Sequence, residues 1–231
     1  HSARRCCGFA QPARRRRPAE GRLTDNPDEK QLRTILAREP GVRKTRYANY
    51  VAESEPTSRS AIFTKNSVDD SFGEDERRLL AQCEEELSHH KLISLDRVVG
   101  NADSGTTVRL IVPERFAHVA YGGGNLFVPC EQPVADPTYQ IVFFYDDAFD
   151  RNRDLPLAQK DITIRLAMLE DGHFVKIIRN GNYIGEYKKG VFAAEDWTQK
   201  TYGKGIFLHA GCREDHLQSA HAGYRTLRTL R

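Results

Sequence analysis

The sequence predicts an α/β fold in which helices flank a mixed sheet. Two observations predict this fold: an amphipathic helix pattern in residues 73–91, and Ile- and Val-rich segments between residues 91 and 180 that are bounded by Asn, Asp and Gly. The composition, with 39% hydrophobic and 29% charged residues, is typical of a globular chain. The 231 residues provide one domain with tails, or two small domains, and we expect a mostly antiparallel sheet.

The first 27 residues are expected to be a basic tail, so that the domain begins at residue 28. Glu20 is the only acid among the first 22 residues, and the Pro, Gly and Arg around it give the chain little to bury. This segment is interpreted as a disordered tail, as sequence outside the true domain, as an arm for nucleic acid or another polyanion, or as a targeting segment. The net charge of only +3 argues against nucleic acid as a partner of the whole molecule.

Two helices are expected before the strands. The first lies in residues 26–41, with Asn26 as its N-cap, Pro27 in its first turn and Pro40-Gly41 as its end. The second lies in residues 73–91 and has acids in its first turn and His89, His90 and Lys91 in its last, as the helix dipole favours. Its apolar face consists of Leu79, Leu80, Cys83 and Leu87.

Five short segments read as strands. They cover residues 91–100, 106–112, 138–145, 161–169 and 173–180. The fourth alternates clearly, because it places Ile162, Ile164, Leu166 and Met168 on one face and Thr163, Arg165 and Ala167 on the other.

Turn signals predict how the last part of the chain continues. Asp171-Gly172 and Asn180-Gly181 each predict a hairpin turn, so residues 161–189 are expected to form a meander of three strands. A helix in residues 191–200 and a buried strand in residues 204–211 should follow.

Cysteine usage and hydropathy indicate the compartment. The five cysteines, Cys6, Cys7, Cys83, Cys130 and Cys212, are irregularly spaced and include no CxxC pair, which argues against a disulfide framework or a structural zinc site. No apolar run approaches the roughly 18–20 residues that a bilayer requires. We therefore expect a cytoplasmic protein that has no membrane partner.

The segment GNYIGEYKKGVF, residues 181–192, contains the first candidate site residues. In a strand, Lys188 and Lys189 would point to opposite faces, so one of them would face inward or into a cleft unless the strand ends at Gly190. A lysine in a cleft beside another cation loses its proton readily and can then ligate a metal. The alternative is a solvated pair at a strand end. His209, at the end of an apolar segment, is the second candidate, with a buried core histidine as the alternative.

Residues 183–192, YIGEYKKGVF, and 204–212, KGIFLHAGC, resemble the ATP-type phosphoenolpyruvate carboxykinases. That family carries Tyr-x-Gly-Glu-x-Lys-Lys-Gly-x-Phe, then a helix, then a Gly-[Ile/Val]-x-x-x-His strand. The matching residues are Tyr183, Gly185, Glu186, Lys188, Lys189, Gly190 and Phe192, and His209 corresponds to the family's histidine with two residues rather than three between it and Ile206. A looser likeness in residues 91–127 includes Arg109, Asn125 and Phe127, and the whole resemblance covers about residues 57–212. It implies that residues 28–212 are the N-terminal, substrate-side domain of such an enzyme.

The resemblance also implies a chemistry. These enzymes, which act in gluconeogenesis, convert oxaloacetate and ATP to phosphoenolpyruvate, CO2 and ADP, with Mn2+ or Mg2+ as the metal. By position, Lys189 and His209 would ligate the metal and contact the nucleotide, and Lys189 would also contact substrate. Lys188 would face phosphoryl or carboxylate oxygens, Tyr183 would contact the CO2 or carboxylate end, and Arg59 would bind a carboxylate.

The sequence departs from the family in three places. SRSAIFTKNSVDD stands where the family has TGRSPKDK, so Arg59 is interpreted either as the substrate arginine or as a surface residue. Gly122–Gly124 are expected to fray a helix. The P-loop GxxGxGKT does not occur, and residues 213–231 read as a tail that is truncated before the nucleotide-binding domain. We therefore expect the chain to be inactive by itself. The alternatives are a non-catalytic binding domain with a polyanion-binding arm and a relic of the same fold.

Overall fold

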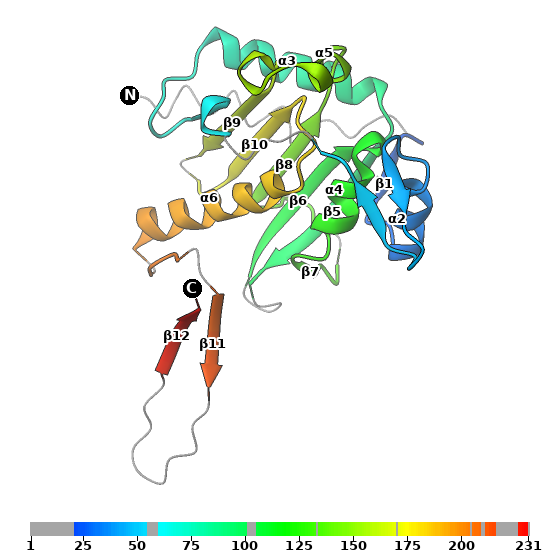
Figure 1. Ribbon diagram of the computed structural model, residues 1–231. Coiled ribbons are helices and arrows are strands. Elements are labelled where there is room, and N and C mark those ends of the chain that lie inside the picture. The colour runs from blue at the N-terminus through cyan, green and yellow to red at the C-terminus, as the bar shows by residue number, and fades with distance from the viewer. Residues whose placement is uncertain are drawn as a thin grey trace. The chain divides into compact units, whose positions relative to one another are not determined.

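The computed structural model describes residues 21–54, 60–100, 105–132, 134–169, 171–203, 205–208, 211–215 and 226–230 (Figure 1). They belong to two compact units, of which the first ends at Ala194 and the second begins at Glu195. The expected α/β class is confirmed, because the first unit is built on a mixed sheet with helices beside it.

A sheet of eight described strands organises the first unit. Its order is β1 (Leu23–Asp25), β5 (Leu92–Val99), β6 (Thr106–Pro113), β8 (Tyr139–Phe144), β10 (Phe174–Arg179), β9 (Thr163–Met168) and β4 (Thr64–Asn66), with β7 (Val128–Pro129) also paired to β5. All five expected strands are present. The expectation of a mostly antiparallel sheet is wrong: β1 with β5, β6 with β8, β8 with β10 and β4 with β9 are parallel pairs. The reason is that the connections between these strands are long crossovers rather than tight turns.

The remaining elements of the first unit are helices and one small hairpin. The helices are α2 (Glu29–Leu36), α3 (Glu74–His89), α4 (Ala117–Gly123), α5 (Ala148–Arg151) and the start of α6 (Gly185–Tyr202). The short 3-10 turns are η2 (Ser60–Ile62), η3 (Glu114–Phe116), η4 (Asn152–Asp154) and η5 (Leu157–Gln159), and β2 (Val42–Lys44) pairs with β3 (Tyr50–Ala52). Among the described helices, none combines the length and the apolar character that crossing a membrane requires.

Apolar side chains pack on both faces of the central strands. The predicted alternation in β9 is confirmed, because Ile164 and Leu166 join the larger core while Ala167 joins a smaller core on the other face. The smaller core contains Leu79, Leu80 and Cys83 of α3, as that helix's sequence pattern predicted. A sheet that is covered on both faces explains why β8 and β10 are almost continuously apolar.

The start of the domain differs from the expectation. Leu23–Asp25 pair with Leu92–Ser94, so the chain joins the sheet before residue 28, and residues 23–27 are not part of a tail. The N-cap of α2 is Asp28 rather than Asn26, because the Asp28 carboxylate accepts from Gln31 N at 2.7 Å in a capping box. Asn26 instead binds Asp96. Residues 1–20 lie outside the described residues.

The third strand of the expected meander is wrong, because the chain forms helix α6 from Gly185 onward. The turn at Asp171-Gly172 is where it was expected and joins two paired strands, β9 and β10, whereas the hairpin turn expected at Asn180-Gly181 does not form and the chain only bends at Asn180. After Asn180, whose φ is +58°, the chain leaves the sheet. The buried residues of α6 then recur at helical spacing: Glu186, Tyr187, Gly190, Val191 and Ala194.

The second unit contains a two-stranded antiparallel pair. β11 (Gly211–Asp215) pairs with β12 (Thr226–Leu230), so the expected C-terminal tail at residues 213–231 contains regular structure in its described part. The buried strand expected at residues 204–211 is wrong for its described residues 205–208, which have no regular structure. Ile206 is 87% exposed, which rules out the expected burial at that position.

Candidate functional site

The start of α6 brings two of the predicted site residues together. The Lys189 Nζ atom lies 5.4 Å from the centroid of the Tyr183 ring. It also lies 2.7 Å from Oε1 of Glu186, one helical turn earlier. Tyr183 itself precedes the helix, and its carbonyl accepts the Glu186 amide at 3.0 Å. The sequence motif therefore folds back on itself, and its tyrosine and second lysine contact each other.

The buried carboxylate of Glu186 connects this cluster to the sheet. Its side chain is buried, and its Oε2 accepts from the Lys176 Nζ at 2.8 Å while Oε1 accepts from Lys189. Lys176 also donates to the Glu186 carbonyl at 2.8 Å. One carboxylate thus joins a buried ammonium group on β10 to a half-exposed ammonium group on α6, and ion pairs of this kind require close partners because both charges are removed from water.

Lys176 is a site residue that sequence reasoning missed. It lies in the apolar run FVKIIR, and its side chain is only 2% exposed. Burial lowers the pKa of Lys176, an effect that Glu186 opposes and Lys189 reinforces. A lysine inside a strand of Val and Ile was the available signal. This lysine indicates a buried charge only if both faces of β10 are covered, and the strand's own sequence does not show that they are.

Lys188 has a different environment. It is exposed, and its Nζ lies 5.0 Å from the ring centroid of Phe192, which is four residues further along α6. Neighbouring residues on a helix point about 100° apart rather than to opposite faces, so the strand argument for the two lysines does not hold. Lys189 nevertheless points inward, as was expected for one of the two lysines, and contacts the buried Glu186.

Two glycines of the motif allow α6 and its first residues to pack closely. A Cβ on Gly190 would lie 2.7 Å from Cδ1 of Ile141 and 2.9 Å from Cδ of Lys176. A Cβ on Gly185 would lie 2.2 Å from the Tyr183 ring. The glycines therefore permit the two contacts that shape the cluster, which are those of the helix with β8 and β10 and of Tyr183 with the first turn.

The glycines of α4 have a similar effect. We expected Gly122–Gly124 to fray this helix, yet it continues to Gly123, and the Gly124 amide donates to the Ala120 carbonyl. Cβ atoms on Gly122 and Gly123 would lie within 3 Å of the side chains of Ile184 and Tyr187. The loss of helix propensity is offset by the close approach of α6 to α4.

The loop that leads into Tyr183 is anchored by His118. Its Nε2 donates to the Asn182 carbonyl at 2.7 Å, and its Nδ1 contacts the carboxylate of Glu39. The same carboxylate accepts the His118 backbone amide at 2.7 Å. All three residues are largely buried, so the position of the residue before Tyr183 is fixed by a polar contact with α4 and with the end of α2.

The residues of the looser likeness have structural contacts. Arg109 binds the buried Asp96 with two hydrogen bonds of 2.7 and 2.9 Å and also donates to the Val134 carbonyl. Phe127 lies edge-on to the Tyr187 ring at 5.3 Å. Asn125 donates to the Tyr121 carbonyl at 3.1 Å. None of these contacts involves Tyr183, Lys188 or Lys189.

The expected metal and substrate ligands include residues that the structure does not describe. Arg59 and His209 lie outside the described residues. Within the described ranges, no three His, Cys, Asp or Glu side chains are grouped so that they could hold a metal ion. A lysine ligates a metal as a neutral amine, whereas Lys189 is engaged in an ion pair with Glu186. The described residues by themselves therefore do not fit a Mn2+ or Mg2+ site.

Comparison with protein-family models and with curated proteins identifies no relative of this chain. No protein-family model matches the chain, and no curated protein matches it.

Proposed function

We propose that this chain is the substrate-side domain of an ATP-type phosphoenolpyruvate carboxykinase, in which the start of α6 binds oxaloacetate or phosphoenolpyruvate. One observation carries the proposal. Tyr183 and Lys189, which the resemblance assigns to the substrate, lie together in space with 5.4 Å between ammonium group and ring centroid. The motif that suggests the family is therefore also a spatial cluster.

The charges at this cluster suit an anionic substrate. Lys188 and Lys189 provide two ammonium groups on the first turns of α6, and the buried Glu186 carboxylate is shared with Lys176. The N-terminal end of a helix also favours negative charge. A compact dianion such as oxaloacetate or oxalate is the ligand class that this arrangement favours.

We assign to residues of this chain only the roles that concern the substrate. Oxaloacetate loses CO2, and the resulting enolate oxygen takes the γ-phosphoryl group of ATP. Tyr183 orients the carboxylate end of the substrate, while Lys188 and Lys189 stabilise the charge that develops on the enolate and phosphoryl oxygens. Metal and nucleotide binding by Lys189 and His209 stay predictions of the resemblance, and the phosphoryl transfer would also require the nucleotide-binding domain that the resemblance implies.

The proposal is tested by isothermal titration calorimetry with oxalate, which is a chemically stable dicarboxylate, and with phosphoenolpyruvate. The Lys189→Ala variant should weaken binding by about tenfold or more, because a charge-assisted hydrogen bond is lost. Lys200→Ala is the matched control, since it removes an exposed lysine from the same helix. Equal affinities for the parent and Lys189→Ala would contradict the proposal.

The metal prediction has a separate test. Mn2+ is titrated into the parent chain and into Lys189→Ala without any substrate. Weaker binding by the variant supports Lys189 as a ligand, and equal affinities favour a relic of the fold that has lost this function.

A further inference from the structure

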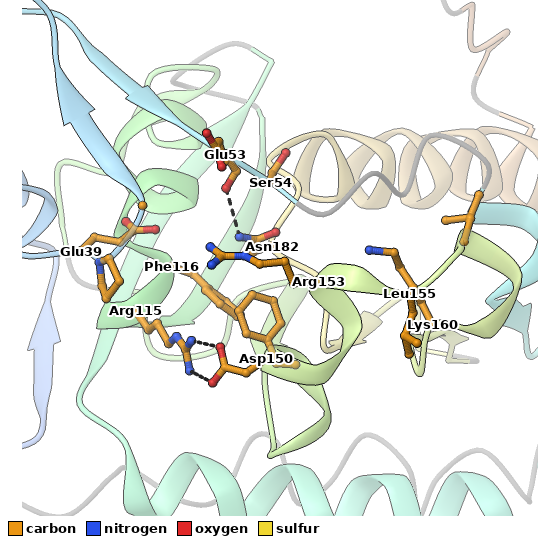
Figure 2. Close-up of a pocket in the computed structure, with 14 residues that line it drawn as sticks. Glu39, Glu53, Ser54, Arg115, Phe116, Asp150, Arg153, Leu155, Lys160 and Asn182 are labelled. Carbon is orange, nitrogen blue, oxygen red and sulfur yellow. Dashed lines mark hydrogen bonds and ion pairs between the residues drawn. The ribbon is translucent and has the colours of Figure 1, made fainter.

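A cavity of about 450 Å³ lies beside the loop that leads into Tyr183, and Asn182 of that loop lines it (Figure 2). Its polar lining includes Asn182, Glu39, Arg115, Asp150, Arg153 and Lys160. The partly buried Phe149 adds an apolar surface, and Phe116, which is only 1% exposed, packs behind it with 4.9 Å between the ring centroids. The volume lies within the range of roughly 300–1,000 Å³ that is usual for small-molecule sites.

The acidic groups of this cavity already have cationic or polar partners. The Asp150 carboxylate receives two hydrogen bonds from Arg115, whose guanidinium lies 5.0 Å from the ring centroid of Phe149. Glu39 contacts both the ring and the backbone amide of His118. Glu53, at the rim, pairs with Arg43 at 3.0 Å. Each of these carboxylates is therefore already engaged by another group of the chain.

Arg153 is the group that this cavity leaves available. It forms no hydrogen bond or ion pair with any residue in the part of the chain that the structure describes. Figure 2 shows its side chain crossing the cavity toward Asn182. Its charge acts on Asp150, whose carboxyl pKa is lowered mainly by the hydrogen bonds from Arg115 and to a smaller extent by Arg153. The planar fork of a guanidinium binds a carboxylate with two parallel hydrogen bonds.

We propose that this cavity binds a small organic carboxylate with an apolar body. The guanidinium of Arg153 binds the carboxylate, and the partly buried Phe149 contacts the apolar part. The proposal does not depend on the carboxykinase function, because Tyr183, Lys188 and Lys189 do not line this cavity.

The test is calorimetric titration of the full chain with three probes: benzoate, acetate and benzyl alcohol. Benzoate carries both features, acetate carries only the carboxylate, and benzyl alcohol carries only the apolar ring with a neutral polar group. Benzoate should bind with an affinity in the millimolar range or better, and each of the other two should bind about tenfold more weakly or worse. Acetate or benzyl alcohol binding as tightly as benzoate overturns the proposal, as does an absence of benzoate binding.

Two variants locate the site. Arg153→Gln should weaken benzoate binding by about tenfold or more. Arg151→Gln is the matched control, because it removes the same charge from an exposed arginine nearby that does not line the cavity. Both arginines are exposed, so neither change should unfold the chain, which circular dichroism verifies. Equal weakening by the two variants overturns the proposal.

A third variant separates this site from the one on α6. Lys189→Ala should leave benzoate affinity unchanged while it weakens oxalate binding. Loss of benzoate binding in Lys189→Ala would assign both ligands to the α6 cluster and overturn the proposal of a distinct site. Failure of oxalate to bind the parent would count against the proposed function alone.

Discussion

Glu186 connects the chemistry of the candidate site to the interior of the protein. Its two carboxylate oxygens bind two different lysines, one buried on β10 and one half-exposed on α6. The exposed lysine therefore has a defined position although its side chain could otherwise take many rotamers. A residue that contacts ligand through its ammonium group gains from such a fixed position, because less freedom is lost on binding.

The buried pair predicts a large effect of Lys176→Met on stability. Removing the ammonium group leaves the Glu186 carboxylate buried with only Lys189 beside it, and breaking a buried ion pair in this way costs about 3–5 kcal/mol. Urea denaturation of the parent and the variant measures the difference. The double variant Lys176→Met/Glu186→Gln should recover part of the loss, since no buried charge is left. Lys65→Met, at an exposed lysine of β4, is the control and should change stability little.

Helix α6 is positioned by small residues rather than by large ones. Gly190 places it against Ile141 and Lys176, and Gly122 and Gly123 let α4 approach Tyr187 of α6 and Ile184, which precedes the helix. Interiors pack at high density, so a single added methyl group at such a contact must displace its neighbours. The orientation of the whole helix, and with it of Lys188 and Lys189, is therefore sensitive to these glycines.

Gly190→Ala tests this packing. The new Cβ would lie within 3 Å of Ile141 and Lys176, and overpacking of this kind costs about 1–3 kcal/mol even though alanine is the better helix former. Gly205→Ala is the comparison, because its Cβ would meet only the end of the flexible Gln199 side chain, at 3.2 Å. Thermal melts followed by circular dichroism measure both variants. A Gly190→Ala chain that melts at or above the parent temperature would contradict this account.

Asp146 joins several parts of the first unit. Its carboxylate accepts from Gln82 on α3, from Arg179 and Asn180 at the end of β10, and from the Ala148 amide at the start of α5. Burial by itself would raise the pKa of this carboxyl group, but the hydrogen bonds from Asn180, Ala148 and Arg179 outweigh it and lower the pKa below its ordinary value of 3.8. The carboxylate of Asp146 thus links α3, the end of β10 and the start of α5 by hydrogen bonds.

The hydrogen bonds of Asp146 predict how the free energy of unfolding depends on pH. Because the folded pKa of Asp146 is below the unfolded one, its contribution is fully present above the ordinary value of 3.8 and is lost as the pH falls through the folded pKa. Asp146→Asn should therefore destabilise the chain at pH 7, by roughly 1–3 kcal/mol, and the difference from the parent should shrink toward about pH 2. Urea titrations at several pH values measure it, with exposed Asp154→Asn as control. A difference that does not change with pH would count against this assignment.

The sequence predicted the positions of individual helices and strands better than it predicted which strands pair and in which direction. The strands and α3 followed from their apolar periods, because each element buries a face that its own residues define. The parallel pairing of β6 with β8 was missed, since it depends on a crossover rather than on either strand. The start of α6 was missed because Asn180-Gly181 also signals a hairpin.

The candidate site was foreseen only where its residues are close in sequence. Tyr183 and Lys189 meet because a helix brings residues of one short motif together. Lys176 is on another element, and its contact with Glu186 could not be read from spacing. Arg153 carries no motif at all, and only the cavity around it makes it a candidate.

The short strand β1 has a consequence for association between copies of this protein. It covers Leu92, Ile93 and Ser94 of β5, and β7 pairs only with Arg97 and Val98 of the same strand. A proteolytic cut or a shortened form that begins at residue 28 would strip the backbone amides and carbonyls of this apolar segment of their partners. Open edges of that kind template pairing with another chain. We therefore expect Leu23–Asp25 to protect the protein against edge-to-edge aggregation, and size-exclusion chromatography of the shortened form should reveal larger species.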